Sequence, residues 1–257
     1  MSGLDLINEA IDKHKLKTVF ALFSGGHDSL CATHVAMQHP AVTTAVHINT
    51  GIGIEKTRQF VRNTCKNFDW KLNEYHPPKA YSELVQTYGF PGPGQHQAMY
   101  IQLKERCLRQ VLREHKTYRR EAIGFITGVR SQESTRRMGH VKPIQKDGSR
   151  IWIACIHDWD SKDKNAYMEK HNLPRNEVVD LLHMSGECLC GAFAKPGERE
   201  EIKLWFPEVY KEIEELEESV ATTGKPCRWG VQPTINPYQT TMNLPLCTSC
   251  IAKNETP

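Results

Sequence analysis

An apolar run that ends in a glycine pair is the feature that most constrains the fold of this chain. Residues 17–23 contain the letters TVFALF, and residues 24–29 follow as SGGHDS before helical periodicity resumes over residues 29–38. A compact apolar run of this length indicates a buried strand, and the glycine pair indicates a tight turn. We therefore expect the chain to leave a buried strand, turn sharply and enter a helix.

This turn has the chemistry of a phosphate-binding loop. Glycines let successive backbone N–H groups converge on an anion, and the following helix adds the positive end of its dipole. The two serines can donate hydroxyl hydrogen bonds to phosphate oxygens, and the aspartate can bind Mg²⁺ or cap the helix. No GK[ST] sequence follows, so this is not a Walker loop. We predict that the phosphate loop consists of Ser24, Gly25, Gly26, His27, Asp28 and Ser29, in preference to an ordinary glycine turn with an aspartate cap.

Strands and helices alternate along much of the chain. The sequence predicts strands over residues 17–23, 43–48, 70–75, 121–127 and 151–156. It predicts helices over residues 3–15, 29–38, 55–68, 95–115, 160–171 and 199–218. This alternation favours an α/β fold with a parallel sheet and right-handed crossovers, in which ligands gather at the carboxyl ends of the strands.

Composition narrows the class of protein. Lysine and arginine exceed aspartate and glutamate by only 33 to 30, which permits an anionic substrate without demanding nucleic acid. A basic stretch at residues 113–120 fits either a nucleic-acid contact or a solvated helix end. No apolar run approaches the roughly 20 residues that span a bilayer. The first 17 residues lack the apolar core of a signal peptide, so we expect a cytoplasmic protein without a membrane partner.

The nine cysteines fall into two groups. Four of them, Cys31, Cys65, Cys107 and Cys155, lie among apolar residues and are interpreted as buried small hydrophobes. The other five lie beyond residue 184, where the tail is too apolar for disorder and too short for a core of its own. In a reducing compartment, clustered thiols indicate a metal before they indicate disulfides. The predicted ligands are Cys188, Cys190, Cys227, Cys247 and Cys250, one thiol more than a four-ligand site needs.

These observations predict a division of the chain into residues 1–183 and a cysteine-rich, metal-binding region over residues 184–257. A CxxC pair is the ordinary half of a tetrahedral zinc or iron–sulfur site, whereas a CxC pair is rarer. Thiolate ligands alone fit both Zn²⁺ and a [4Fe–4S] cluster. Scattered free thiols, or a redox pair at Cys247 and Cys250, are the alternatives.

Three stretches together resemble a known superfamily. Residues 24–29 are similar to the SGGxDS signature of the N-type ATP pyrophosphatases. Residues 46–51 (VHINTG) and 127–136 (TGVRSQESTR) resemble segments of the phosphoadenosine phosphosulfate (PAPS) reductase superfamily, and the likeness covers roughly residues 15–195. The resemblance implies an adenine nucleotide α-hydrolase-like sheet, with Thr50 and Gly51 near the adenosine. It also places residues 185–191 where iron–sulfur relatives, including DNA phosphorothioation enzymes, carry a cysteine turn, which favours the [4Fe–4S] cluster over zinc.

The stretch over residues 127–136 contributes further candidate site residues. Arg130 and Arg136 suit phosphate or sulfate oxygens because a guanidinium presents a planar fork of donors, although surface arginines on a loop are the alternative. Glu133 can orient an arginine and Ser134 can hydrogen-bond phosphate. His27 and His47 are either proton shuttles or structural imidazoles. We predict Asp28, Arg130 and Arg136 as catalytic residues, with Thr50, Gly51, Gly128, Arg130, Glu133 and Ser134 joining the loop in nucleotide binding.

The complete loop separates this chain from familiar PAPS reductases, whose loops are eroded. The chain also lacks their carboxyl-terminal Glu-Cys-Gly-Leu/Ile-His motif and the Cys-Cys pair of adenylylsulfate (APS) reductases, and Asn49 replaces the usual aspartate. The sequence therefore favours an enzyme that adenylates a substrate with ATP and Mg²⁺, releases pyrophosphate and lets a nucleophile such as sulfur displace AMP. The acceptor is unknown, and a nucleic acid acceptor and a homodimer are both compatible with the sequence. The alternatives are a PAPS or APS reductase and a non-catalytic nucleotide-sensing or nucleic-acid-binding module.

Overall fold

The computed structural model describes residues 2–133 and 142–230, and contacts divide the chain into two compact units. The first, called the sheet unit, comprises Met1–Ile48, Arg58–Tyr75 and Leu108–Glu177. The second, called the helical unit, comprises Asn49–Thr57, His76–Cys107 and Val178–Pro257. Because the units interleave along the chain, they are not linear segments, and the division between residues 183 and 184 stays a prediction.

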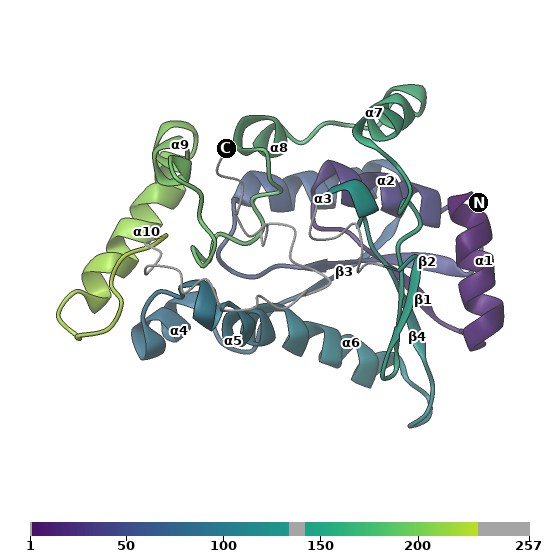
Figure 1. The fold of residues 1–257 in the computed structure, drawn as a ribbon, viewed down its shortest axis with the longest axis horizontal. Coiled ribbons are helices and arrows are strands. Elements are labelled where there is room, and N and C mark those ends of the chain that lie inside the picture. The colour runs from purple at the N-terminus through teal and green to yellow at the C-terminus, as the bar shows by residue number, and fades with distance from the viewer. Residues whose placement is uncertain (1, 134–141, 231–257) are drawn as a thin grey trace. The chain divides into compact units, whose positions relative to one another are not determined.

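A six-stranded sheet in the order β3-β2-β1-β4-β6-β5 forms the centre of the sheet unit (Figure 1). The strands are β1 Val19–Leu22, β2 Val42–Ile48, β3 Lys71–Tyr75, β4 Ile123–Ile126, β5 Ile144–Asp147 and β6 Arg150–Ile153. All neighbouring strands pair in parallel except β5 with β6. In the middle of the sheet Ala21 pairs with both Ala45 and Ile126. The predicted α/β class and parallel sheet are confirmed, whereas the antiparallel edge strand β5 was not predicted.

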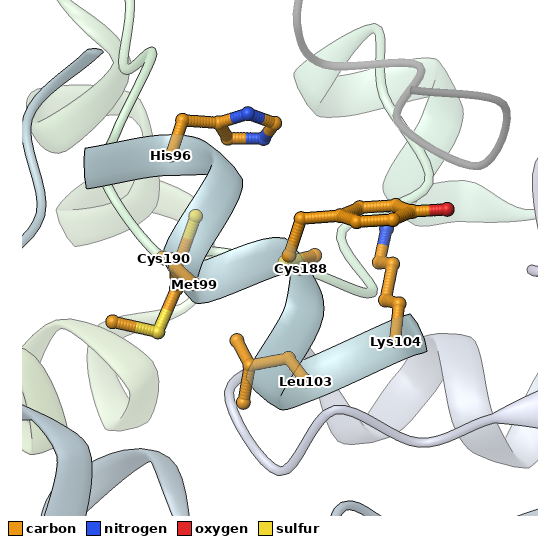
Figure 2. A pocket seen from close by; sticks show the side chains of 7 residues that line it. His96, Met99, Leu103, Lys104, Cys188 and Cys190 are labelled. Atoms are coloured by element: carbon orange, nitrogen blue, oxygen red, sulfur yellow. The ribbon is translucent and has the colours of Figure 1, made fainter. Parts of the chain in front are cut away.

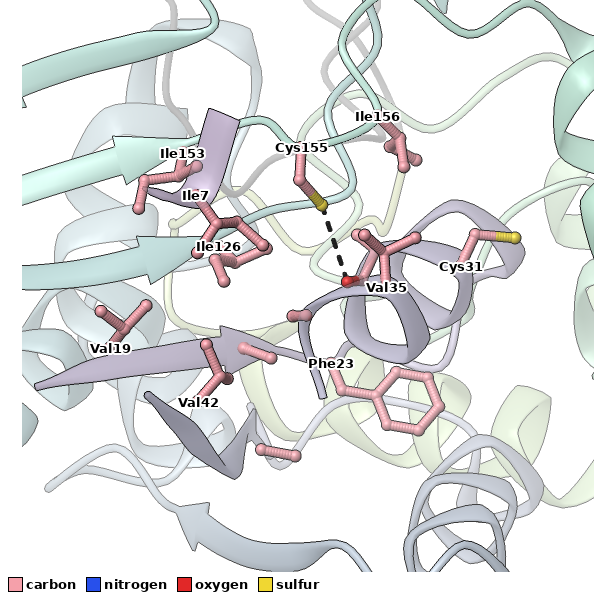
Figure 3. Close-up of a cluster of buried hydrophobic side chains, with 14 of the residues drawn as sticks. Ile7, Val19, Phe23, Cys31, Val35, Val42, Ile126, Ile153, Cys155 and Ile156 are labelled. Carbon is pink, nitrogen blue, oxygen red and sulfur yellow. Dashed lines mark hydrogen bonds between the residues drawn. The ribbon is translucent and has the colours of Figure 1, made fainter. Parts of the chain in front are cut away.

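Both faces of the central strand β1 are covered. Side chains alternate across a strand, so Val19 and Ala21 lie on one face and Phe20 on the other. The first face joins the core cluster in Figure 3, which includes residues of α1 (Gly3–His14) and α2 (His27–Ala36). Phe20 instead contacts His115, with ring centroids 4.8 Å apart, at the end of α6 (Arg106–His115). Burial on both faces explains the uninterrupted apolar run of this strand.

The remaining helices of the sheet unit agree with the predicted spans to within a few residues. They are α3 (Glu55–Asn67), which begins in the helical unit, and α7 (Ser161–Lys170). Asp160 caps α7 by accepting from the backbone N–H groups of Lys162 and Asp163. The predicted start of this helix is therefore confirmed by a capping side chain.

The helical unit holds its own hydrophobic cluster, which includes residues of α4, α5, α9 and α10. Its elements are α4 Tyr81–Tyr88, η1 Pro93–Gln95, α5 His96–Tyr100, η2 Ile101–Glu105, α8 Glu177–Leu182, α9 Glu198–Trp205 and α10 Pro207–Val220. The predicted helix over residues 95–115 is present, but η2 is a turn of π-helix inside it. The predicted helix over residues 199–218 is two helices, because Pro207 cannot continue a helix and begins a new one. No helix among the described residues is long and apolar enough to cross a membrane.

Candidate functional site

The phosphate loop, residues 24–29, is a closed turn between β1 and α2 in the sheet unit. Gly25 has a φ of +82°, a conformation that glycine adopts without strain. The Ser29 hydroxyl donates to the carbonyl of Gly26 at 2.8 Å, and the Ser24 hydroxyl donates to Ser29 Oγ at 3.1 Å. Gly26 is the N-cap of α2 and makes no side-chain capping bond. The serines thus brace the loop, while the first N–H groups of α2 lack a side-chain cap and have no intrahelical partner.

Asn176, near the C-terminal end of the sheet unit's sequence, anchors this loop. This residue was not predicted from the sequence. Its Nδ2 donates to the carbonyl of Gly25 at 2.9 Å, and its backbone N–H donates to His27 Nε2 at 3.1 Å. Asn176 and His27 are 2% and 5% exposed. Because His27 Nε2 accepts a hydrogen bond, the imidazole is neutral at that nitrogen, which favours a structural histidine over a proton shuttle. No local spacing signals a partner about 150 residues away.

Gly128 lies against the backbone of the same loop. A Cβ atom at this position would lie 2.5 Å from the Ser29 nitrogen and 2.6 Å from the Asp28 carbonyl carbon. Those distances are shorter than any van der Waals contact, so only glycine lets the chain after β4 approach the start of α2. The structure gives Gly128 a packing role beside the predicted role in nucleotide binding.

Asp28 and Arg130 form a two-pronged ion pair. Arg130 Nε and Nη2 donate to the two carboxylate oxygens of Asp28 at 3.0 and 3.2 Å, and Nη1 donates to the Trp159 carbonyl at 3.4 Å. Arg130 is only 7% exposed. A bidentate pair fixes the plane of the guanidinium. The sequence predicted separate roles for these two residues, and the structure joins them.

The rest of this predicted stretch is only partly described. The turn η3 spans Ser131–Glu133, and the Ser131 hydroxyl donates to the His157 carbonyl at 3.0 Å. Ser134 and Arg136 lie outside the described residues. Their predicted contacts with phosphate stay predictions, as does that of Glu133.

The four early cysteines are buried. Burial raises the pKa of each of the four thiols to about 12. Cys155 donates to the Ala32 carbonyl at 3.6 Å within the core (Figure 3). These thiols stay protonated near neutral pH, so the prediction that they are small hydrophobes is confirmed.

In the helical unit, the segment predicted to lie near adenosine is bound to the start of the cysteine-rich region. The Thr50 backbone N–H donates to Glu187 Oε1 at 2.8 Å, and the Thr50 hydroxyl donates to the Glu187 carbonyl at 2.6 Å. Thr50 is fully buried, whereas Gly51 is exposed and its N–H donates to Asn49 Oδ1 at 3.0 Å. The Thr50 hydroxyl is therefore used for internal structure.

The cysteines of the segment 186–191, called the thiol turn, line a small pocket (Figure 2). The residues that line it are His96, Met99, Tyr100, Leu103, Lys104, Cys188 and Cys190. A hydrogen bond from Cys190, aided by the charge of Lys104, lowers the pKa of Cys188 below the usual thiol value. The same hydrogen bond and burial raise the pKa of Cys190.

The structure does not bring the predicted metal ligands together within its described residues. Within residues 2–133 and 142–230, no three His, Cys, Asp or Glu side chains gather in a way that could hold a metal ion. Cys188 and Cys190 supply two adjacent thiols, and Cys227 does not line their pocket. Cys247 and Cys250 lie outside the described residues. The metal centre, and the choice between iron–sulfur and zinc, stay predictions.

Comparison with known proteins supports the fold. A PAPS reductase structure from Candida auris superposes with a TM-score of 0.55 at 17% identity, covering 70% of this chain and 85% of that chain. An APS reductase from Bacillus cereus is 24% identical over 191 residues, 72% of this chain and 77% of that protein. A PAPS reductase from Synechocystis is 24% identical over 148 residues, 54% of this chain and 55% of that protein. An uncharacterised protein from Methanocaldococcus jannaschii is 25% identical over 222 residues, 84% of this chain and 44% of that protein. The chain thus spans about half the length of the last two relatives.

The family model described as the phosphoadenosine phosphosulfate reductase domain matches residues 18–185. The match begins at the buried strand β1 and includes the phosphate loop, Gly128 and Arg130. The predicted superfamily is therefore confirmed, and it supports a nucleotide-binding enzyme of this superfamily. The chain belongs to the PAPS reductase domain family.

Proposed function

We propose that the chain binds ATP through the phosphate loop and adenylates an acceptor with release of pyrophosphate. In the second step of this reaction, sulfur displaces AMP from the adenylated acceptor, which is a nucleic acid or a small metabolite. The braced loop at the start of α2 is the observation that carries the proposal. Family membership supports an adenine nucleotide as ligand, because the curated relatives are named as PAPS and APS reductases.

The loop offers main-chain donors to an anion. Gly25 turns the chain, Gly26 leaves the first turn of α2 without a side-chain cap, and α2 is ten residues long. The positive end of the helix dipole and uncapped N–H groups together favour a phosphate. Asn176 and Gly128 fix the loop from two sides, so little ordering is needed when the nucleotide binds.

Arg130 is the cation assigned to the transition state. A guanidinium carries five N–H donors, of which Asp28 takes two and the Trp159 carbonyl takes one. The Asp28 carboxylate therefore orients the fork and leaves donors for a phosphate oxygen. When an acceptor oxygen attacks the α-phosphorus, a new P–O bond forms, the bond to the bridging oxygen breaks and pyrophosphate leaves. Arg130 then offsets the negative charge that develops on the α-phosphoryl oxygens.

The described residues do not give Mg²⁺ a complete site. Both carboxylate oxygens of Asp28 already accept hydrogen bonds from Arg130, and no three suitable side chains gather in the described ranges. In this arrangement Asp28 acts as the positioning partner of Arg130. Magnesium bound to the triphosphate itself is part of the substrate.

A PAPS or APS reductase is the second candidate, and the names of the curated relatives favour it. In that reaction a thiolate attacks sulfur and sulfite is the product. The two candidates therefore differ in the released product, sulfite or pyrophosphate.

Calorimetry on the full, metal-replete chain tests both candidates. ATP, PAPS and APS are titrated separately, and pyrophosphate and sulfite are then assayed with pooled nucleic acids and thiol donors as probes. The proposal expects ATP binding and acceptor-dependent release of pyrophosphate. Sulfite release from PAPS or APS would establish the second candidate, and absence of binding by all three nucleotides at millimolar concentration would overturn both.

A further inference from the structure

Two cysteines of the helical unit, Cys188 and Cys190, have no role in the proposed adenylation. Cys188 and Cys190 lie two residues apart in the chain and line one pocket. In Figure 2, both side chains lie beside a helical segment that carries Met99, Leu103 and Lys104. The pocket therefore combines a thiol pair, an apolar lining and one cationic side chain.

The backbone of the thiol turn is fixed on several sides. The Leu189 N–H donates to the Ile52 carbonyl at 2.7 Å, and the Trp229 indole N–H donates to the Leu189 carbonyl at 2.7 Å. The Tyr81 hydroxyl donates to the Cys190 carbonyl at 2.9 Å. Leu189 is 1% exposed and holds the turn in the core. These three backbone groups are bonded within the protein, and the turn offers its two thiols as functional groups.

Solvent access separates Cys188 and Cys227 from the other described cysteines. Cys31, Cys65, Cys107, Cys155 and Cys190 are buried, whereas Cys188 and Cys227 are partly exposed. Of these two cysteines, Cys188 lines the pocket together with Cys190, whereas Cys227 does not line it. A reagent in solution can therefore reach Cys188 first, with Cys190 placed behind it.

We propose that Cys188 and Cys190 form a thiol–disulfide exchange site that accepts small disulfides carrying negative charge. The thiol pair supplies the electrons, and Lys104 in the pocket lining favours an anionic partner. This inference is independent of the adenylation chemistry, since every residue that carries it belongs to the helical unit.

The reaction has two balanced steps. The Cys188 sulfur attacks one sulfur of the partner disulfide, a mixed disulfide forms, the partner's S–S bond breaks and one thiol leaves with the Cys188 proton. The Cys190 sulfur then attacks Cys188 Sγ, the internal disulfide forms and the second thiol leaves with the Cys190 proton. The protein loses two electrons and two protons, and one disulfide becomes two thiols.

The test uses the full chain, purified without oxygen and analysed first for iron, sulfide and zinc. The protein is mixed with oxidised glutathione, which is anionic, or with neutral 2-hydroxyethyl disulfide, and its peptides are examined by mass spectrometry. We expect an internal disulfide between Cys188 and Cys190. Cys190→Ser should trap the mixed disulfide on Cys188, and Cys188→Ser should lose the exchange.

Two further variants complete the design. Cys227→Ser should react like the wild type, and Lys104→Gln should slow the reaction with oxidised glutathione more than that with the neutral disulfide. A native protein in which the pair resists both disulfides while the unfolded chain reacts would overturn the proposal. The same holds if metal bound by Cys188 and Cys190 blocks exchange, or if the disulfide forms with Cys227 instead. Asp28→Asn should lower the rate of pyrophosphate release and leave the exchange unchanged, so failure of the adenylation proposal and failure of the exchange proposal are separable.

Discussion

The phosphate loop and the thiol turn are built alike but present different functional groups. Each is a glycine-containing turn held by hydrogen bonds from residues distant in sequence, Asn176 for the loop and Trp229 for the turn. In the phosphate loop the side chains brace the turn, which leaves main-chain donors for a ligand. In the thiol turn neighbouring residues bind the main chain, which leaves the thiols. Under the two proposals, the chain uses backbone chemistry in the sheet unit and side-chain chemistry in the helical unit.

The largest expected effect comes from Arg130, the side chain beside the phosphate loop that we assign to the transition state. Arg130→Ala should lower turnover by about a hundredfold or more, because it removes the cation from the transition state. Arg130→Lys should recover little of this, because an ammonium cannot replace the fork that Asp28 orients. Rates of pyrophosphate release, with circular dichroism as the check on folding, measure the effect. Wild-type turnover in both variants would show that Arg130 is not part of the site.

Asp28→Asn sharpens the same comparison. The amide keeps the shape of the carboxylate but loses its charge, so the guanidinium should lose its fixed orientation and turnover should fall by about tenfold. If Asp28 acts only through Arg130, the double variant Asp28→Asn/Arg130→Ala should be no slower than Arg130→Ala. A further loss in the double variant would give Asp28 a separate role, such as holding magnesium.

Two glycine substitutions test whether the regions are independent. Gly128→Ala places a methyl group within 2.6 Å of the backbone at Asp28 and Ser29, and Gly191→Ala places one 2.8 Å from the Trp229 indole. Each should cost about 1–3 kcal/mol of stability, because a packed backbone or ring must shift. We expect Gly128→Ala to weaken nucleotide binding and spare thiol reactivity, and Gly191→Ala to do the reverse. Calorimetry measures nucleotide binding and thiol labelling measures thiol reactivity in both variants. Equal losses in both assays would show that the two regions are not independent.

The sequence predicted the parts of this molecule whose cause is local. The run over residues 17–23 implied a buried strand because both its faces are covered, and the SGGHDS letters implied the turn because glycine permits it. The edge strand β5 was missed because its exposed Gln145, Lys146 and Asp147 carry no apolar pattern. Asn176 was missed because a single asparagine has no signature, and only the folded sheet unit brings it to Gly25.

The contribution of Asn176 to nucleotide affinity can be measured directly. Asn176→Asp removes the donor to the Gly25 carbonyl at nearly constant shape, and should raise the dissociation constant of the nucleotide by about tenfold, since a buried carbonyl loses its partner. Asn172→Asp, which lies in the loop after α7, is the matched control. Nucleotide titration of both variants decides the matter, and unchanged affinity in Asn176→Asp would show that the loop holds its shape without this anchor.

The corresponding anchor of the thiol turn is Trp229. Trp229→Phe keeps most of the buried ring but removes the indole N–H that reaches the Leu189 carbonyl, and should cost about 1 kcal/mol. Chemical denaturation gives this free energy, and labelling of Cys188 reports how far the turn has loosened. Faster labelling with unchanged nucleotide affinity is expected, whereas loss of nucleotide affinity would show that the two regions depend on each other.

The smallest expected effect concerns the ion pair that supports Trp229. Arg199 donates to both carboxylate oxygens of Glu217, and the Trp229 backbone N–H donates to Glu217 Oε1 at 2.8 Å. Burial alone would raise the pKa of Glu217, but these hydrogen bonds outweigh it and the pKa is lowered. A carboxylate with a lowered pKa stabilises the fold above its unfolded pKa, and this stabilisation is lost as the pH falls through the folded pKa.

Glu217→Gln should therefore cost about 1 kcal/mol at pH 7 and progressively less below about pH 4, where the wild-type carboxylate also becomes protonated. Urea unfolding of wild type and variant across this range measures the difference. Glu212→Gln, an exposed glutamate of the same helix α10, should follow the wild type throughout. A constant gap between wild type and Glu217→Gln would show that the carboxylate charge adds nothing to the support of Trp229. The thiol turn would then be held by packing and by hydrogen bonds that do not depend on this charge, as the phosphate loop is held by Asn176 and Gly128.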